Sequence, residues 1–238
     1  MQILSIGNSF SSDATRYLHR IAKAAGDDIT TVNLYIGGCP LSRHYRNMLS
    51  KEKAYTLNFN GQSTGFFVSL DDALLNRDWD IITIQQASRF SIDYDSYQPY
   101  LDDLTSYVRM CCPKAKIVMH ETWAYEEGSE KLKNLGYNNQ KEMYDALHAA
   151  YCNATYATDA FLKIPSGTLF QKLYDKGFKF HRDTYHASFG LGRYALGLLW
   201  YATLTGKDIT DNSFRDFDEP ISEEDIKTVK ECVMATLG

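Results

Sequence analysis

The chain contains 238 residues, of which 44% are hydrophobic and 23% charged, a composition typical of one soluble globular domain with a sizeable core. Its formal net charge is -5 and no segment carries a basic stripe, so we expect neither nucleic acid nor an anionic membrane as a partner. The 5 cysteines are odd in number and lack the spacing of metal ligands, which argues against a disulfide framework and against a zinc site.

The sequence predicts a small-molecule or carbohydrate partner and leaves the oligomeric state open. No window of about 18 apolar residues occurs. The first residues, Met1 to Leu4, lack the charged and apolar regions of a signal peptide. We therefore expect a cytoplasmic protein as given, and a periplasmic or secreted one if a signal peptide has been removed.

Short apolar runs recur along the chain and end in polar or glycine-rich turns. Each has the length of a buried strand and lacks in-out alternation, which is typical of parallel sheets. The runs are 3–6, 31–36, 81–84, 117–119 and, less clearly, 161–164.

Helix-period stretches lie between these runs, for example at 14–25 and 97–110. Strand, helix and strand in repetition predict right-handed crossovers and a three-layer α/β/α sandwich. We find no repeat or linker, so one domain over 1–238 is expected. Chemistry in such folds gathers at the carboxyl ends of the strands.

The segment Tyr55 to Val68 departs from that rhythm. Two β-rich runs flank Asn60-Gly61, a dipeptide favoured in tight hairpin turns, and we interpret the segment as a surface excursion. Near the C-terminus, the apolar stripe from Leu191 to Ala202 predicts a helix that stops at Gly206, and Ser222 is expected to cap a last helix.

The first predicted strand leads directly into Gly7-Asn8-Ser9. A serine at a strand-to-helix turn can project its hydroxyl from the sheet edge, where backbone N–H groups can face an oxyanion. Glycine, asparagine and serine are also ordinary turn residues and helix caps, so a purely structural role remains an alternative.

Asp183 and His186 precede the long apolar helix. A spacing of three lets the carboxylate hold one imidazole nitrogen while the other faces a nucleophile. A solvated pair at a helix start would look the same. A metal site formed by His181, Asp183 and His186 is a weaker alternative, because three ligands on one short loop rarely close a site.

These two blocks together resemble the first and last motifs of the SGNH (GDSL-like) hydrolases. The resemblance covers nearly the whole chain and implies a flavodoxin-like sandwich with a five-stranded parallel sheet, with Ser9, Asp183 and His186 as the catalytic triad. More narrowly, the chain resembles a bacterial subfamily of unassigned function through GNSFS, GGCPLSRH, WDIITIQQAS, HETWAY and HASFGLGRYALGLLWYATLTG.

In the wider family, a glycine and an asparagine join the serine N–H as oxyanion donors. Gly38, or its neighbour Gly37, matches the glycine by position, although a tight turn alone would explain it. The usual Gly-x-Asn-Asp is absent, and Gln85-Gln86-Ala87-Ser88 stands there. Since a glutamine amide can donate, the resemblance favours Gln86 as the third donor and Gln85 as the second choice.

Several side chains near the expected sheet edge are candidates for substrate binding. An indole can stack on a sugar or acyl group, and imidazole and phenol groups can line the mouth of a pocket. Each is also a common packed or hydrogen-bonded residue. The candidates are Gln85, Trp123, His120, Tyr185 and His44.

The combined motifs predict a serine esterase that hydrolyses small acyl esters through an acyl-enzyme and needs no cofactor or metal. By resemblance to related esterases, we expect O-acetyl groups, including those on carbohydrates. The alternative is a non-catalytic glycan-binding protein that uses Trp123. A phosphate- or flavin-binding module is weaker, because the loop from Gly7 to Ser12 lacks a P-loop lysine and Asp183 and His186 would have no role.

Overall fold

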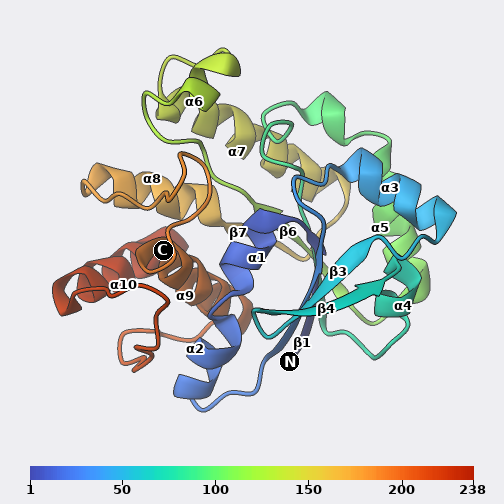
Figure 1. The fold of residues 1–238 in the computed structure, drawn as a ribbon, viewed down its shortest axis with the longest axis horizontal. Helices are drawn as coiled ribbons and strands as arrows, with labels where there is room; N and C mark the ends of the chain where they lie inside the picture. Colours follow the sequence, from blue (N-terminus) through green and yellow to red (C-terminus); the bar gives the residue numbers. More distant parts are fainter.

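Seven strands form one sheet in the computed structural model, which describes residues 1–238 (Figure 1). The sheet order is β4-β3-β2-β1-β5-β6-β7, and the five strands from β2 to β7 in that order pair in parallel. The strands are β1 (Gln2–Gly7), β2 (Thr30–Tyr35), β3 (Tyr55–Phe59), β4 (Gln62–Val68), β5 (Ile81–Ile84), β6 (Lys116–Glu121) and β7 (Leu162–Pro165).

Helices cover both faces of this sheet. Figure 1 shows α1, α2, α8, α9 and α10 on one side and α3, α4 and α5 on the other, while α7 packs against β6 and β7. The helices are α1 (Ser9–Thr15), α2 (Leu18–Ala24), α3 (Leu41–Ser50), α4 (Leu70–Leu74), the 3-10 helix η1 (Tyr94–Tyr97), α5 (Tyr100–Cys111), α6 (Glu130–Asn134), α7 (Gln140–Ala157), α8 (Ser166–Asp175), α9 (Leu191–Thr205) and α10 (Glu223–Leu237). The predicted α/β/α sandwich is confirmed.

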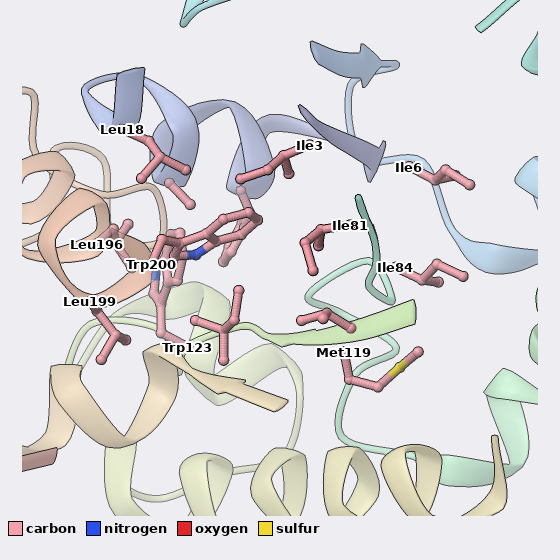
Figure 2. Packing of buried hydrophobic residues seen from close by; sticks show 14 of the residues in the cluster. Ile3, Ile6, Leu18, Ile81, Ile84, Met119, Trp123, Leu196, Leu199 and Trp200 are labelled. Atoms are coloured by element: carbon pink, nitrogen blue, oxygen red, sulfur yellow. The ribbon is translucent and has the colours of Figure 1, made fainter. Parts of the chain in front are cut away.

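The core lies on both faces of the central strands, as expected for parallel strands covered on two sides. Ile3, Ile6 and Ile84 are fully buried. Figure 2 shows Trp123, which follows β6, together with Trp200 of α9 in this packed interior. The continuous apolar character of β1 and β5 follows from this two-sided burial.

Two expectations about the N-terminal half are corrected. The hairpin at Asn60-Gly61 forms, but it is not a separate excursion: β3 pairs antiparallel with β2 and extends the sheet from five strands to seven. The helix expected at 14–25 begins at Ser9 and is interrupted after Thr15, giving α1 and α2. The side chain of Asn8 caps α1, which explains the earlier start.

The C-terminal predictions are confirmed. Gly206 ends α9 in the left-handed conformation with φ +69°, and the side chain of Ser222 accepts a hydrogen bond from the N–H of Asp225 to cap α10. No helix is both long and apolar enough to cross a bilayer.

Candidate functional site

Ser9 stands at the first position of α1, immediately beyond the carboxyl end of β1. The preceding Asn8 orders this turn, because its Oδ1 accepts a 3.0 Å hydrogen bond from the N–H of Phe10. Its Nδ2 donates to the carbonyl of Cys39 at 3.2 Å, which ties the serine turn to the turn after β2. The packed sheet and these bonds therefore fix where the Ser9 hydroxyl points.

The segment 181–187 is a compact loop held against the same sheet edge. His181 and Ala187 form an isolated β-bridge, and the N–H of Arg182 donates to the carbonyl of His186 at 3.0 Å. The indole of Trp123, which is not part of this loop, anchors it by donating to the Tyr185 carbonyl at 2.8 Å. This anchoring places a C-terminal loop beside an N-terminal serine.

The structure brings Ser9, His186 and Asp183 into one hydrogen-bonded chain. The Ser9 Oγ lies 2.8 Å from His186 Nε2, and His186 Nδ1 lies 2.7 Å from Asp183 Oδ2. Asp183 Oδ1 also accepts from the backbone N–H of His186 at 2.9 Å. Partial burial raises the pKa of the Asp183 carboxyl, but the hydrogen bonds from His186 outweigh it and hold that pKa below its usual value. Asp183 is therefore an anion that orients the imidazole.

A cavity of about 310 Å³ opens at Ser9. Gly38 lies in the turn that lines it and has φ +59°, a conformation that favours glycine, so the predicted tight turn is present. The cavity is lined by Asn8, Ser9, Phe10, Tyr35, Gly37, Gly38, Ser88, Arg182, Tyr185 and His186. Its size suits a small ligand group rather than a long chain.

The structure contradicts Gln86 as an oxyanion donor. Its Nε2 donates to the backbone carbonyl and hydroxyl of Ser96 at 3.0 and 3.2 Å, and its Oε1 accepts from the N–H of Leu41 at 3.0 Å. The side chain is buried and does not line the cavity. Ser88 reaches the cavity instead, with its Oγ 2.9 Å from the Tyr125 hydroxyl.

Gln85 is also buried, but it acts on the Ser9 turn indirectly. Its Nε2 donates to Asn8 Oδ1 at 2.9 Å, and its Oε1 accepts from His120 Nδ1 at 2.8 Å. These bonds orient the Asn8 amide that caps α1. The predicted substrate-binding roles of Gln85 and His120 are therefore wrong, and the two form a buried support for the serine turn.

Burial also overturns two other predicted contacts. Trp123 is 0% exposed and stacks on Phe10 with ring centroids 4.2 Å apart, and His44 is 0% exposed with Nδ1 3.0 Å from the Tyr55 hydroxyl. Burial lowers the pKa of both His44 and His120 to about 3, so these imidazoles are neutral. Of the five predicted contacts, only Tyr185 lines the cavity.

The metal alternative also finds no support. His181 is held by a 3.0 Å hydrogen bond to the carbonyl of Ala124, and no group of three metal-binding side chains occurs. Cys39 lies next to Gly38, but burial raises the pKa of its thiol to about 12. Cys39 is therefore a neutral packed residue.

Sequence reasoning missed a second hollow that also begins at Ser9. It measures about 530 Å³ and is lined by Arg16, Arg182 and Arg193 together with polar side chains of α1 and the β3–β4 hairpin. The arginines are far apart in the sequence, so no sequence motif predicts that they lie together. The one usable signal is the spacing of Arg16 from Ser9. It corresponds to two turns along one helical stretch and places Arg16 on the same side as Ser9.

Structural comparison supports the fold assignment. A DUF4886 family protein from Bacteroides uniformis has a TM-score of 0.92 with this chain and 33% identity, with all of this chain and 94% of the other covered. A protein from Slackia heliotrinireducens described as a candidate SGNH hydrolase has a TM-score of 0.62 and 21% identity over 86% of this chain and 98% of its own. An acetylxylan esterase from Geobacillus stearothermophilus has a TM-score of 0.53 and 14% identity over 85% and 91%.

The fold expected from the sequence resemblance is thus the fold of SGNH-type esterases and lipases. No protein with a curated function matches this sequence. The sequence pattern of a domain of unknown function, DUF4886, matches residues 2–233, which is nearly the whole chain. The chain therefore belongs to the DUF4886 family, with the fold of the SGNH hydrolases.

Proposed function

We propose that this protein is a serine esterase that hydrolyses small acyl esters. The observation that carries the proposal is the hydrogen-bonded chain from Ser9 through His186 to Asp183 at the mouth of a cavity. In a domain of this fold, a hydroxyl 2.8 Å from an imidazole that is oriented by a carboxylate is the arrangement of an activated nucleophile.

In the proposed reaction, His186 Nε2 takes the proton from Ser9 as its Oγ attacks the ester carbonyl. The carbonyl oxygen becomes an oxyanion, and the imidazolium then gives its proton to the leaving alcohol. Water attacks the resulting acyl-enzyme with His186 again as the base, which releases the carboxylic acid and restores Ser9. The Asp183 carboxylate keeps the imidazole in the required tautomer and stabilises its charged form.

The backbone N–H groups of Ser9 and Gly38 are the proposed oxyanion donors, since both residues line the cavity. Ser88 replaces Gln86 as the third candidate. Ser88 lines the cavity, and the contact of its hydroxyl with Tyr125 restricts the rotation of that hydroxyl. A single oxyanion donor contributes about 10²- to 10³-fold to turnover in serine hydrolases, so Ser88→Ala tests this assignment directly.

A short acyl group fits the cavity, and O-acetyl esters, including those on carbohydrates, are the proposed substrates. The volume of about 310 Å³ and the polar groups around it, among them Ser88 and Arg182, favour a small group over a fatty acyl chain. The acetylxylan esterase with the same fold acts on acetyl esters of a polysaccharide, as its name states.

The rival proposal, a non-catalytic glycan-binding protein, has its best support in the altered motif at Gln85-Gln86, but it loses its proposed binding surface. It relied on Trp123 as an exposed stacking surface, but that side chain is 0% exposed and belongs to the core. A serine hydroxyl in contact with an oriented imidazole at the mouth of a cavity also has no part in such binding.

Hydrolysis of p-nitrophenyl acetate by the wild type, Ser9→Ala and His186→Ala tests the proposal. Both variants should lose at least about 10³-fold in turnover, because serine and histidine act as a unit. Ser106→Ala is the matched control, since Ser106 is an exposed residue of α5 remote in sequence from the site. Full activity in folded Ser9→Ala, or a wild type no faster than buffer on this and other acetyl esters, would reject the esterase.

A further inference from the structure

The second hollow, which begins at Ser9, has a chemical character that differs from the cavity at Gly38. We call it the arginine cleft. Its walls come from α1, the β3–β4 hairpin, the 181–187 loop and α9. The lining residues are Ser9, Ser12, Asp13, Arg16, Tyr35, Thr56, Asn58, Gly61, Gln62, Ser63, Arg182 and Arg193.

Three guanidinium groups line this cleft, and the carboxylate of Asp13 lies buried beneath them. Asp13 is 1% exposed and accepts 2.8 Å bonds from both Arg182 and Arg193. The arginine side chains remain 16 to 21% exposed. Asp218, which pairs with Arg16 and Arg193, is 26% exposed but does not line the cleft, so the guanidinium groups are the exposed charges of its lining.

These arginines keep many hydrogen-bond donors that the protein does not use. Each guanidinium has five N–H donors. Arg182 donates to protein groups only through Nη1, and Arg193 through Nε and Nη1. Arg16 makes three such bonds, two of them to Asp218. More than half of the donors on the three side chains are left for water or a ligand.

Ser12 adds another donor to the same wall. Its Oγ accepts hydrogen bonds from Asn33 Nδ2 at 2.7 Å and from Asn58 Nδ2 at 3.0 Å. With both of these donors already on the oxygen, the hydroxyl proton is available for a further acceptor. A donor-rich surface of this kind fits a ligand that is rich in acceptors.

The hairpin is held tightly enough to serve as a wall. Arg16 Nη1 donates to the Gly61 carbonyl at 2.9 Å, and a side chain at position 61 would bring a Cβ within 2.3 Å of the Arg16 carbonyl oxygen. Gly61 also has φ +80°, so glycine is required twice over at this turn. The hairpin thus extends the sheet (Figure 1), and its residues line the cleft that begins at Ser9.

We propose that the arginine cleft binds an oxyanion group on the alcohol portion of the ester, a carboxylate or a sulfate or phosphate, while the acyl group occupies the cavity at Gly38. This inference rests on the proposed esterase function. Guanidinium groups match such anions in geometry as well as charge. A neutral apolar chain would leave these donors without partners. The positive lining also stands out in a chain of net charge -5.

The kinetic test compares mono-O-acetylated galacturonic acid with its neutral carboxamide by acetate release. The wild type should prefer the carboxylate by about tenfold or more in kcat/KM, mainly through a lower KM, because one charge-assisted hydrogen bond is worth at least that factor. Arg16→Gln should remove most of this preference, measured as the ratio of the two kcat/KM values.

Two further variants make this test specific. Arg20→Gln is the matched control, because Arg20 lies on α2, pairs with Asp216 and does not line the cleft, so the preference should remain. Gln62→Glu adds a negative charge to the lining through an exposed side chain. It should abolish the preference without removing an ion pair, which covers the case in which Arg16→Gln does not fold.

Calorimetric binding to Ser9→Ala separates failure of the inference from failure of the esterase. Galacturonate, inorganic sulfate and inorganic phosphate are titrated, with galactose as the neutral probe, and the tightest anion identifies the group. Equal rates on both esters, together with Ser9-dependent hydrolysis, would overturn the anionic cleft alone. If Ser9→Ala binds an anion and loses this binding when Gln62→Glu is added, but the wild type hydrolyses no ester, only the esterase proposal is rejected. No anion binding and no anionic preference would overturn the inference.

Discussion

Two sets of polar side chains lie at the carboxyl edge of the same sheet, in opposite environments. Ser9, after β1, and His186, on the C-terminal loop, face a cavity. Gln86, after β5, and His120, at the end of β6, are fully enclosed. A strand end therefore delivers a residue to the edge, but the segments that cross this edge decide whether it meets a ligand or becomes part of the scaffold.

The largest expected effect concerns the residues that face the cavity. Asp183→Asn should lower kcat on p-nitrophenyl acetate by about 10²- to 10⁴-fold, because an amide favours the wrong imidazole tautomer. The Asp183 side chain is 45% exposed, so water can take over part of its hydrogen bonding to His186. This explains why the expected loss of kcat extends down to about 10²-fold. Asp175→Asn, an exposed residue at the end of α8, is the control. Unchanged kcat in Asp183→Asn would contradict the role of the carboxylate.

Trp123→Ala tests another fully enclosed side chain at the same edge of the sheet. The change removes a fully buried indole that stacks on Phe10 and holds the Tyr185 carbonyl, so the free energy of unfolding should fall by about 3–5 kcal/mol. Urea denaturation measures this. In protein that remains folded, kcat on p-nitrophenyl acetate should also fall, because the indole anchors the loop that carries His186. A folded variant with the wild-type stability and kcat would contradict this supporting role.

The enclosed histidine at β6 should also make stability depend on pH. Burial lowers the folded-state pKa of His120 to about 3, whereas an unfolded histidine titrates near ~6.5. Between these values the unfolded state binds the extra proton, so stability is full above ~6.5 and falls as the pH drops.

His120→Asn measures this contribution, because an asparagine amide keeps a donor for Gln85 but does not titrate. Between pH 7 and pH 5, the wild type should lose about 2 kcal/mol more unfolding free energy than the variant. Equal losses in the two proteins, measured by urea denaturation, would show that His120 accepts a proton while folded.

The smallest expected effect concerns Gln85, an enclosed side chain that hydrogen-bonds to Asn8 beside Ser9. Gln85→Met keeps the side-chain length but removes the bond that orients Asn8, so kcat should fall by about tenfold with KM nearly unchanged. Thermal unfolding of the same variant reports its fold. A variant that is less stable but has the wild-type kcat would reduce Gln85 to a packing role.

Much of this architecture could be predicted from the sequence, for identifiable reasons. The runs at Ile3, Ile81 and Ile117 form central strands because burial on both faces selects continuous apolar residues. The turn at Asn60-Gly61 was predicted from its dipeptide, but the pairing of β3 with β2 was not, because a hairpin signal says nothing of which strand lies beside it.

The site divides in the same way. Ser9, Asp183 and His186 carry local motifs, and the structure brings them together. Gln86 and Trp123 are misassigned because burial arises from segments distant in sequence, such as the start of α3 and the 181–187 loop. The three arginines of the arginine cleft come from three separate segments, so only the folded chain could show it.

The most direct test of the central claim is covalent labelling with a fluorophosphonate, followed by peptide mass spectrometry. The account predicts one label, on Ser9, formed as its Oγ displaces fluoride from phosphorus, and a strongly slowed reaction in His186→Ala. Labelling of another residue, or an unmodified Ser9 in folded protein, would contradict the claim that His186 activates Ser9 as a nucleophile.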